Sequence, residues 1–281
     1  MQVKTITLMK VFFLFLFLTF TYASFGQIKI GGTVKQSDSS ILSYVNVGIK
    51  LKSVGTVSNE SGQFGVEIPK QFLKDTLTFS YVGFEELNVP IQSIVHSSIH
   101  VFVLKSKTTQ LAEIVIKSKE LKQRKIGTKS HNPFLWGTAQ SKASNDIIEF
   151  AKFINIKNKV SRIQSVHIYL GGGVTIDSAT FRINFYNVAN GLPVDKIVDK
   201  NIIERMVIKK GWLTIDLTKE KIVLDQNFFV SFEFMPEQKF SKYGFSYGAQ
   251  FGGNYVSRNS SLGNWEKGSG ASLSAYVTLL Q

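Results

Sequence analysis

The chain has 281 residues, of which 43% are hydrophobic, 12% aromatic and 19% charged, enough for one large or two small domains with real cores. This balance excludes an intrinsically disordered chain, which would be poor in aromatic residues and rich in charge. The absence of cysteine excludes disulfide frameworks, cysteine-ligated zinc and thiol nucleophiles. The net charge of +13 raises the question of a nucleic acid or an anionic surface as the partner.

The N-terminus has the three parts of a secretory signal peptide. Lys4 and Lys10 precede an apolar block at 11–20, and the small residues Ser24 and Gly26 suit cleavage directly after Gly26. A membrane span needs about 20 apolar residues, so cleavage is favoured over a membrane anchor.

We therefore expect an exported protein in the periplasm or at the outer membrane or cell surface. An exported protein rarely meets nucleic acid, so we expect no nucleic acid and predict an envelope protein or a cell-surface glycan as the partner. Peripheral association with the outer membrane is consistent with export, and the oligomeric state is left open.

Alternating apolar residues predict about seven short strands directly after the signal. Successive side chains of a strand point to opposite faces, so residues two apart share a face. The predicted shared faces are Val45/Val47/Ile49, Phe64/Val66/Ile68, Leu77/Phe79/Tyr81 and Ile99/Val101/Val103. This pattern is typical of a small β-sandwich.

The same region carries an ordered series of short motifs. They are Gly32-Thr33-Val34, Tyr44-Val45-Asn46-Val47, Gly55-Thr56-Val57, Ser61-Gly62-Gln63-Phe64 and the block 77–84, which reads LTFSYVGF. Their order resembles the carboxypeptidase regulatory-like domain, a transthyretin-like sandwich of many exported Bacteroidetes proteins that also occurs at the N-terminus of TonB-dependent receptors. The resemblance covers about 28–105 and implies a non-catalytic accessory module.

Residues 106–130 are strongly basic and differ in character from the strands before them. Within them, 111–116 resembles the strand that joins this kind of domain to the plug of TonB-dependent transporters. A transporter barrel needs about 22 strands, more than 130–281 can supply, so we expect the resemblance to be to the module and not to the transporter. We interpret the segment as a solvated linker between domains, with a strip that binds polyanions as the alternative.

From His131 onward the strands become longer and denser in aromatic residues. The expected inward faces are Val166/Ile168/Leu170, Phe181/Ile183/Phe185, Leu213/Ile215/Leu217, Phe228/Val230/Phe232/Phe234 and Ala271/Leu273/Ala275/Val277/Leu279. Residues 145–153 suit a helix or an edge strand equally. The predicted fold is all-β, with a transthyretin-like β-sandwich followed by a larger, jelly-roll-like antiparallel β-sandwich. The predicted segments are 1–26 signal peptide, 27–105 regulatory-like sandwich, 106–130 basic linker and 131–281 jelly-roll-like sandwich.

Catalytic motifs are weak in this sequence. Gly244-Phe245-Ser246-Tyr247-Gly248 matches G-x-S-x-G, but no histidine lies beyond His167 to serve as a base and no helical pattern follows. A glycosidase would need a carboxylate pair across a cleft. The candidates are Glu204, Asp216, Glu233 and Glu237, and Glu233 is expected to point to solvent. We therefore predict no catalytic residues and no enzymatic activity.

Metal and cofactor patterns are equally weak. The histidines at 96, 100, 131 and 167 lack the H-E-x-x-H spacing of a zinc enzyme. Asp177, Asp195, Asp199 and Asp225 lie in or near expected loops, which leaves a structural calcium ion as an alternative. Gly171-Gly172-Gly173 lacks the Lys-Ser/Thr of a phosphate-binding loop and indicates a hairpin. No cofactor and no metal site are predicted.

Aromatic residues mixed with small polar ones in 240–270 are the best ligand-binding candidates. Trp265, Tyr255, Tyr247 and Arg258 are predicted as ligand-binding residues, Trp265 first because it lies among glycine and asparagine. Core packing of the same rings is the alternative. The sequence thus predicts a non-catalytic exported envelope protein acting as an interaction or accessory module. The alternative is a module that binds carbohydrate or peptidoglycan through these aromatic loops.

Overall fold

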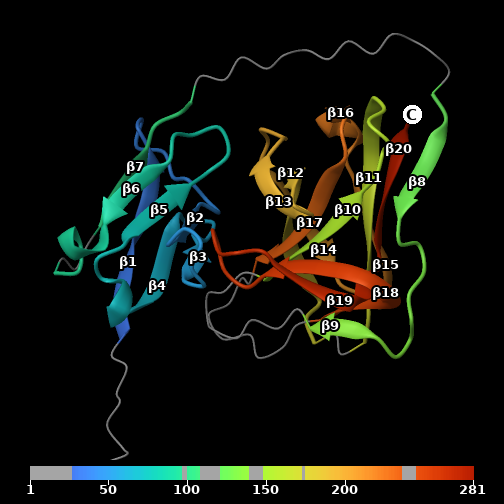
Figure 1. Cartoon of the computed structure of the whole chain (residues 1–281). Helices are drawn as coiled ribbons and strands as arrows, with labels where there is room; N and C mark the ends of the chain where they lie inside the picture. Colours follow the sequence, from blue (N-terminus) through green and yellow to red (C-terminus); the bar gives the residue numbers. More distant parts are fainter. Residues whose placement is uncertain (1–26, 97–99, 108–120, 139–147, 173–174, 236–244) are drawn as a thin grey trace, which may run out of the picture.

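The structure, a computed structural model, describes residues 27–96, 100–107, 121–138, 148–172, 175–235 and 245–281, so the predicted signal peptide lies outside it. The described chain is almost entirely β and forms two sandwiches that lie side by side (Figure 1). Its helical parts are three single 3₁₀ turns, η1 (Lys70–Phe72), η2 (Ile91–Ser93) and η3 (Thr218–Glu220). None of the helices in these ranges is long and apolar enough to cross a membrane.

The N-terminal sandwich packs a three-stranded sheet against a four-stranded one. The first has the order β4–β1–β7 and the second β3–β2–β5–β6. Their bounds are β1 Gln27–Gln36, β2 Asn46–Gly48, β3 Gly55–Val57, β4 Gln63–Pro69, β5 Thr76–Ser80, β6 Leu87–Pro90 and β7 Val101–Leu104. Strands β1 and β7 run parallel and the other pairs antiparallel. The small β-sandwich expected from the alternation is confirmed.

The phase of the alternation was predicted correctly for most of these strands but not for β7. Phe64, Ile68 and Leu77 lie in the core as expected. In β7 the buried residues are Phe102 and Leu104, and the expected inward residues Val101 and Val103 face outward. Valine alternates there with phenylalanine and leucine, so both faces are apolar and the pattern alone does not fix which one is buried.

The C-terminal sandwich has two antiparallel layers. One has the order β14–β12–β17–β10–β18 and the other β15–β11–β20–β8, while β13 and β19 extend the first and β16 and β9 add short pairings. The bounds are β8 Gln123–Gly127, β9 Trp136–Thr138, β10 Ile148–Ile154, β11 Ser161–Leu170, β12 Ser178–Ala189, β13 Leu192–Lys196, β14 Ile202–Val207, β15 Gly211–Asp216, β16 Val223–Leu224, β17 Phe228–Met235, β18 Ser246–Arg258, β19 Glu266–Leu273 and β20 Ala275–Leu280. Strand β18 connects the layers, because its start pairs with β9 and β11 and its end with β10.

This strand order is that of a jelly roll. The first strand, β8, pairs with the last, β20, and the chain then alternates between layers from β10 to β11 to β12. The hairpin β18–β19 is an addition at the edge next to β10. The jelly-roll-like sandwich predicted from the sequence is therefore confirmed.

The first jelly-roll strand falls within the segment interpreted as a linker. Residues Gln123–Gly127 pair with β20 along their whole length. Ile126 is the only apolar residue of β8, and the charged residues beside it are exposed. An edge strand with such exposed cations shows no hydrophobic alternation, which is why the sequence pattern resembled a linker.

The segment offered as a helix or an edge strand is a central strand. Residues Ile148–Ile154 form β10, which lies between β17 and β18. Its neighbour β17 is buried on both faces, and Glu233, expected in solvent, is 0% exposed. The reason lies in what covers the outer face of this layer.

Candidate functional site

The outer face of the β12–β17–β10–β18 layer holds a row of buried polar and charged side chains. Glu149 lies opposite both Glu233 and Arg258 in the register, and Arg182 lies opposite Glu233 on the other side. Asn184 is the next outward residue of β12. All five are buried, between 0% and 8% exposed, which is rare for charged residues unless they are paired.

Both carboxylates of this row accept hydrogen bonds from protein donors, and Glu149 accepts several. Arg258 donates from Nε to Glu149 Oε2 at 2.6 Å, and the Asn184 amide donates to both Glu149 and Glu233 at 3.0 and 2.9 Å. The hydroxyls of Tyr186 and Ser231 also donate to Glu149 Oε1. This arrangement satisfies two carboxylates that would otherwise repel each other at close range.

Burial and neighbouring charges shift the pKa values of the ionisable groups in and beside this row. Burial alone would raise the pKa of Glu233, but the positive charges of Arg182, Lys196 and Arg258 outweigh burial and lower it. Burial opposes the charged form of Arg258, yet Glu149 raises its pKa above the ordinary value. Burial, followed by the charge of Arg182, lowers the pKa of Lys196 to about 8. Glu233 is therefore ionised at neutral pH and is a poor proton donor.

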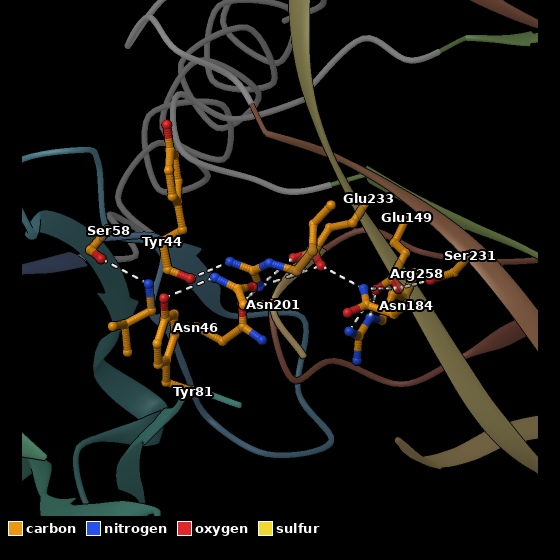
Figure 2. A network of polar contacts seen from close by, with 12 residues as sticks. Tyr44, Asn46, Ser58, Tyr81, Glu149, Asn184, Asn201, Ser231, Glu233 and Arg258 are labelled. Carbon is orange, nitrogen blue, oxygen red and sulfur yellow. Dashed lines mark hydrogen bonds and ion pairs between the residues drawn. The ribbon is translucent and has the colours of Figure 1, made fainter. Parts of the chain in front are cut away.

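Arg182 connects this row to the N-terminal sandwich. Figure 2 shows Tyr44 and Asn46 of that sandwich on one side of the polar network and Glu233, Glu149 and Arg258 of the jelly roll on the other. Its Nη1 donates to Asn46 Oδ1 at 2.6 Å and approaches Glu233 at 3.4 Å, while its Nη2 donates to the carbonyl of Tyr44. A second contact runs from the Asn201 amide to the Tyr81 hydroxyl at 2.9 Å. One fully buried guanidinium thus joins acceptors from two separate sandwiches.

A second part of the same interface is made by backbone. Leu51 donates its N–H to the carbonyl of Leu262 at 2.9 Å, and its own carbonyl accepts from the Asn264 amide at 2.8 Å. Gly55 lies so close to the Ser261 carbonyl that a Cβ there would be 2.4 Å from the oxygen. The interface therefore requires a residue without a side chain at this point.

Backbone strain gathers at this junction. Tyr44, Leu51 and Leu262 all have left-handed backbone, with φ of 62°, 60° and 60°. Such a conformation costs on the order of 1 kcal/mol for a residue with a side chain, and strained residues persist only where their surroundings fix them. Here each strained residue presents a backbone group to the opposite sandwich.

The predicted ligand-binding residues fall into three different environments. Arg258 and Trp265 are brought together, with the guanidinium 4.7 Å from the indole centroid, and Trp265 also meets Tyr186 edge to face at 5.5 Å. Tyr255 is 39% exposed on the opposite face of β18, with its ring over Gly268. Tyr247 is 1% exposed in the core of the jelly roll against Phe150, Phe245 and neighbouring apolar residues. The four residues do not form one site, and Arg258 forms an ion pair with Glu149.

Ser246 of the G-x-S-x-G pattern has a structural partner. Its hydroxyl donates to the carbonyl of Gly172 at 2.7 Å, at the end of the β11 strand. The other candidate carboxylates are scattered: Glu204 lies on β14 opposite Phe181 and Asp216 ends β15, while Glu237 is outside the described residues. In the described part of the chain no three His, Asp or Glu side chains gather in a position to hold a metal ion.

Sequence reasoning missed the residues that carry the interface. Arg182 and Asn184 alternate with Phe181 and Ile183, a pattern that normally indicates a solvent-facing row. The sequence nevertheless contained a signal for this row, because acidic and basic residues occur at the matching outward positions of β10, β12 and β17.

Comparison with known proteins identifies the N-terminal unit. Residues 30–116 match the family described as CarboxypepD_reg-like domain. TonB-dependent receptor P3 of Formosa agariphila is 31% identical over 110 residues, which are 39% of this chain and 10% of that receptor. The chain thus carries a carboxypeptidase regulatory-like domain, a module that it shares with a TonB-dependent receptor, and it matches only a small part of the receptor's length.

Proposed function

We propose that this protein is a non-catalytic envelope protein that acts as an interaction module, with its two sandwiches working as one rigid unit. The observation that carries the proposal is Arg182, which is 2% exposed and spans both sandwiches. Interfaces between the domains of one chain are usually polar and allow the domains to move relative to each other. A buried cation that bonds to both sandwiches instead fixes their relative orientation.

The buried carboxylates support the non-catalytic part of the proposal. Glu149 and Glu233 are a close pair of the kind that acid–base chemistry uses, but both are 0% exposed and occupied by protein donors. A general acid must be able to hold a proton near the working pH, and the lowered pKa of Glu233 works against that. The pair therefore holds the fold together.

The place in the envelope rests on the signal-like N-terminus and on the shared module. The relative is named a TonB-dependent receptor, and this chain begins with a segment that has the pattern of a cleaved export signal. We expect the mature protein to start at Gln27 and to fractionate with the periplasm or the outer membrane.

The test uses the full chain in its native envelope. A photo-crosslinking residue is placed at exposed Val101 of the N-terminal sandwich and, as a matched control, at exposed Val207 of the jelly roll. The proposal expects one envelope partner, near stoichiometric, from one of the two positions and not from both. Loss of that crosslink in the Arg182→Ala variant would support the rigid unit. The proposal would be refuted if neither position captured a partner, or if the purified protein turned over ester or glycoside substrates.

A further inference from the structure

The outer face of the second jelly-roll layer, β15–β11–β20–β8, carries aromatic residues that neither the interface nor the core uses. On β11, Val166 and Ile168 point inward, so Ser165, His167 and Tyr169 point outward. The register places Trp212 opposite Tyr169 and Tyr276 opposite His167. Neighbouring strands therefore bring these rings together on one face. We call Tyr169, Trp212 and Tyr276 the aromatic platform.

The rings of the platform support one another. Trp212 meets Tyr169 at 5.5 Å and Tyr276 at 5.0 Å between ring centroids, both edge to face. His167 stacks on Tyr276 at 4.1 Å and His131 on Tyr169 at 3.6 Å. Edge-to-face pairs fix ring orientations, so the platform is organised before any ligand arrives.

Gly248 leaves space for the Tyr169 ring, and the aromatic row continues beyond it to β9. A Cβ on Gly248 would be 2.6 Å from the Tyr169 ring, so the ring lies directly over this residue. Trp136, which is 55% exposed, lies opposite Gly248 in the register and continues the aromatic row onto β9.

The surroundings of the platform are hydroxylic and mainly basic, with Asp216 of β15, which lies opposite Ser165, as an acidic residue on the same face. Ser165, Thr214 and Thr278 surround His167 and hydrogen-bond to its ring at 2.9 Å each. Lys125, an exposed residue of β8, lies 5.7 Å from the Tyr276 centroid. Lys209 and Lys210 are exposed in the turn directly before Trp212.

We infer that the aromatic platform binds an acidic polysaccharide, with sugar rings stacked on Trp212 and Tyr276 and the acidic groups paired with Lys125 and its basic neighbours. The platform lacks the exposed aliphatic side chains of a protein-docking patch, and its rings alternate with hydroxyl groups. The C–H faces of a sugar ring pack against aromatic rings, and its hydroxyls suit polar neighbours. The positive rim and the positive net charge of the chain favour an anionic over a neutral polysaccharide. This inference deepens the proposed function and rests on it.

The experiment is affinity electrophoresis and calorimetry of the full mature chain with dextran sulfate and with polygalacturonate. Neutral dextran is the control, because it shares the backbone of dextran sulfate without the charge. Both anionic probes test the shared chemistry, and the stronger of the two identifies sulfate or carboxylate as the recognised group. Binding is expected to weaken with salt, as contacts between exposed charges do.

Variants locate the site. Trp212→Ala is expected to weaken binding about tenfold, the effect of losing one to two aromatic contacts. Phe251→Ala removes an aromatic ring that is 63% exposed away from the platform and should leave binding unchanged. Lys125→Gln changes an exposed side chain, so it keeps the test valid if Trp212→Ala unfolds. It should weaken binding severalfold and reduce the salt dependence, whereas Lys74→Gln, an exposed lysine of the N-terminal sandwich, should do neither.

Three results would overturn the inference: no binding of either anionic probe, equal binding of neutral dextran, or unchanged binding in both Trp212→Ala and Lys125→Gln. If an envelope partner is still crosslinked in cells while the glycan probes fail, only this inference falls and the proposed function stands. If the probes bind but no envelope protein is captured, the proposed function falls and the glycan site stands on the binding data alone.

Discussion

Removal of the Arg182 side chain is the sharpest perturbation that the structure offers. In Arg182→Ala, Glu233 stays buried without its cation, and Asn46 and the Tyr44 carbonyl lose their donor. Breaking a buried ion pair by removing one partner costs about 3–5 kcal/mol. A whole domain is stable by only about 5–15 kcal/mol, so the variant should lose a large share of its stability.

The assay separates the two sandwiches. The three tryptophans, at 136, 212 and 265, all belong to the jelly roll, so their fluorescence reports its unfolding in urea. Far-ultraviolet circular dichroism reports both sandwiches. The two signals should change together in the wild-type protein and separately in Arg182→Ala, because docking couples the two unfolding transitions.

Two control variants test the reasoning behind this magnitude. Asn46→Ala removes one hydrogen bond to a charged donor and should cost about 1.5–3 kcal/mol. In the double variant Arg182→Ala with Glu233→Gln no uncompensated charge remains, so it should be more stable than Arg182→Ala alone. A loss below about 0.5 kcal/mol in Arg182→Ala, the range of an ordinary surface substitution, would refute the buried bridge. The buried bridge would also be refuted if the stability loss of the double variant equalled the sum of the losses of Arg182→Ala and Glu233→Gln.

Three further predictions follow from single residues. Gly55→Ala should separate the two unfolding transitions, because its Cβ would lie 2.4 Å from the Ser261 carbonyl; retention of a single coincident transition would contradict this contact. Burial, followed by the charge of Lys125, lowers the pKa of His167 from 6.5 to about 4, so its contribution to stability is complete above pH 6.5 and lost as the pH falls toward 4. Urea midpoints measured at pH 7 and pH 5 should therefore differ less in His167→Gln than in the wild type, and an equal difference would argue against this pKa. Ser246→Ala should cost about 1 kcal/mol through the lost hydrogen bond to Gly172, and neither form should hydrolyse esters; ester turnover by the wild type that the folded variant lacks would instead support a nucleophile.

Much of the fold was predictable from the sequence, because its signals are local. Period-two alternation located strands such as β4 and β20, and turn residues separated them. The order of short motifs identified the regulatory-like domain, which residues 30–116 confirm. Strand β8 was missed because its outward charges leave a single apolar residue to signal it.

The sequence by itself determined the fold class, the two sandwiches and the inward residues of most strands. Only the tertiary structure decided what covers each outward face. Glu233 and Arg182 have the pattern of solvent-facing residues, yet packing of the N-terminal sandwich against β12 buries them. In contrast, Trp212 and Tyr276 remain on a face that no described element covers completely. The physical reason is that alternation encodes which side of a strand a residue occupies, whereas its burial depends on contacts between segments far apart in the chain.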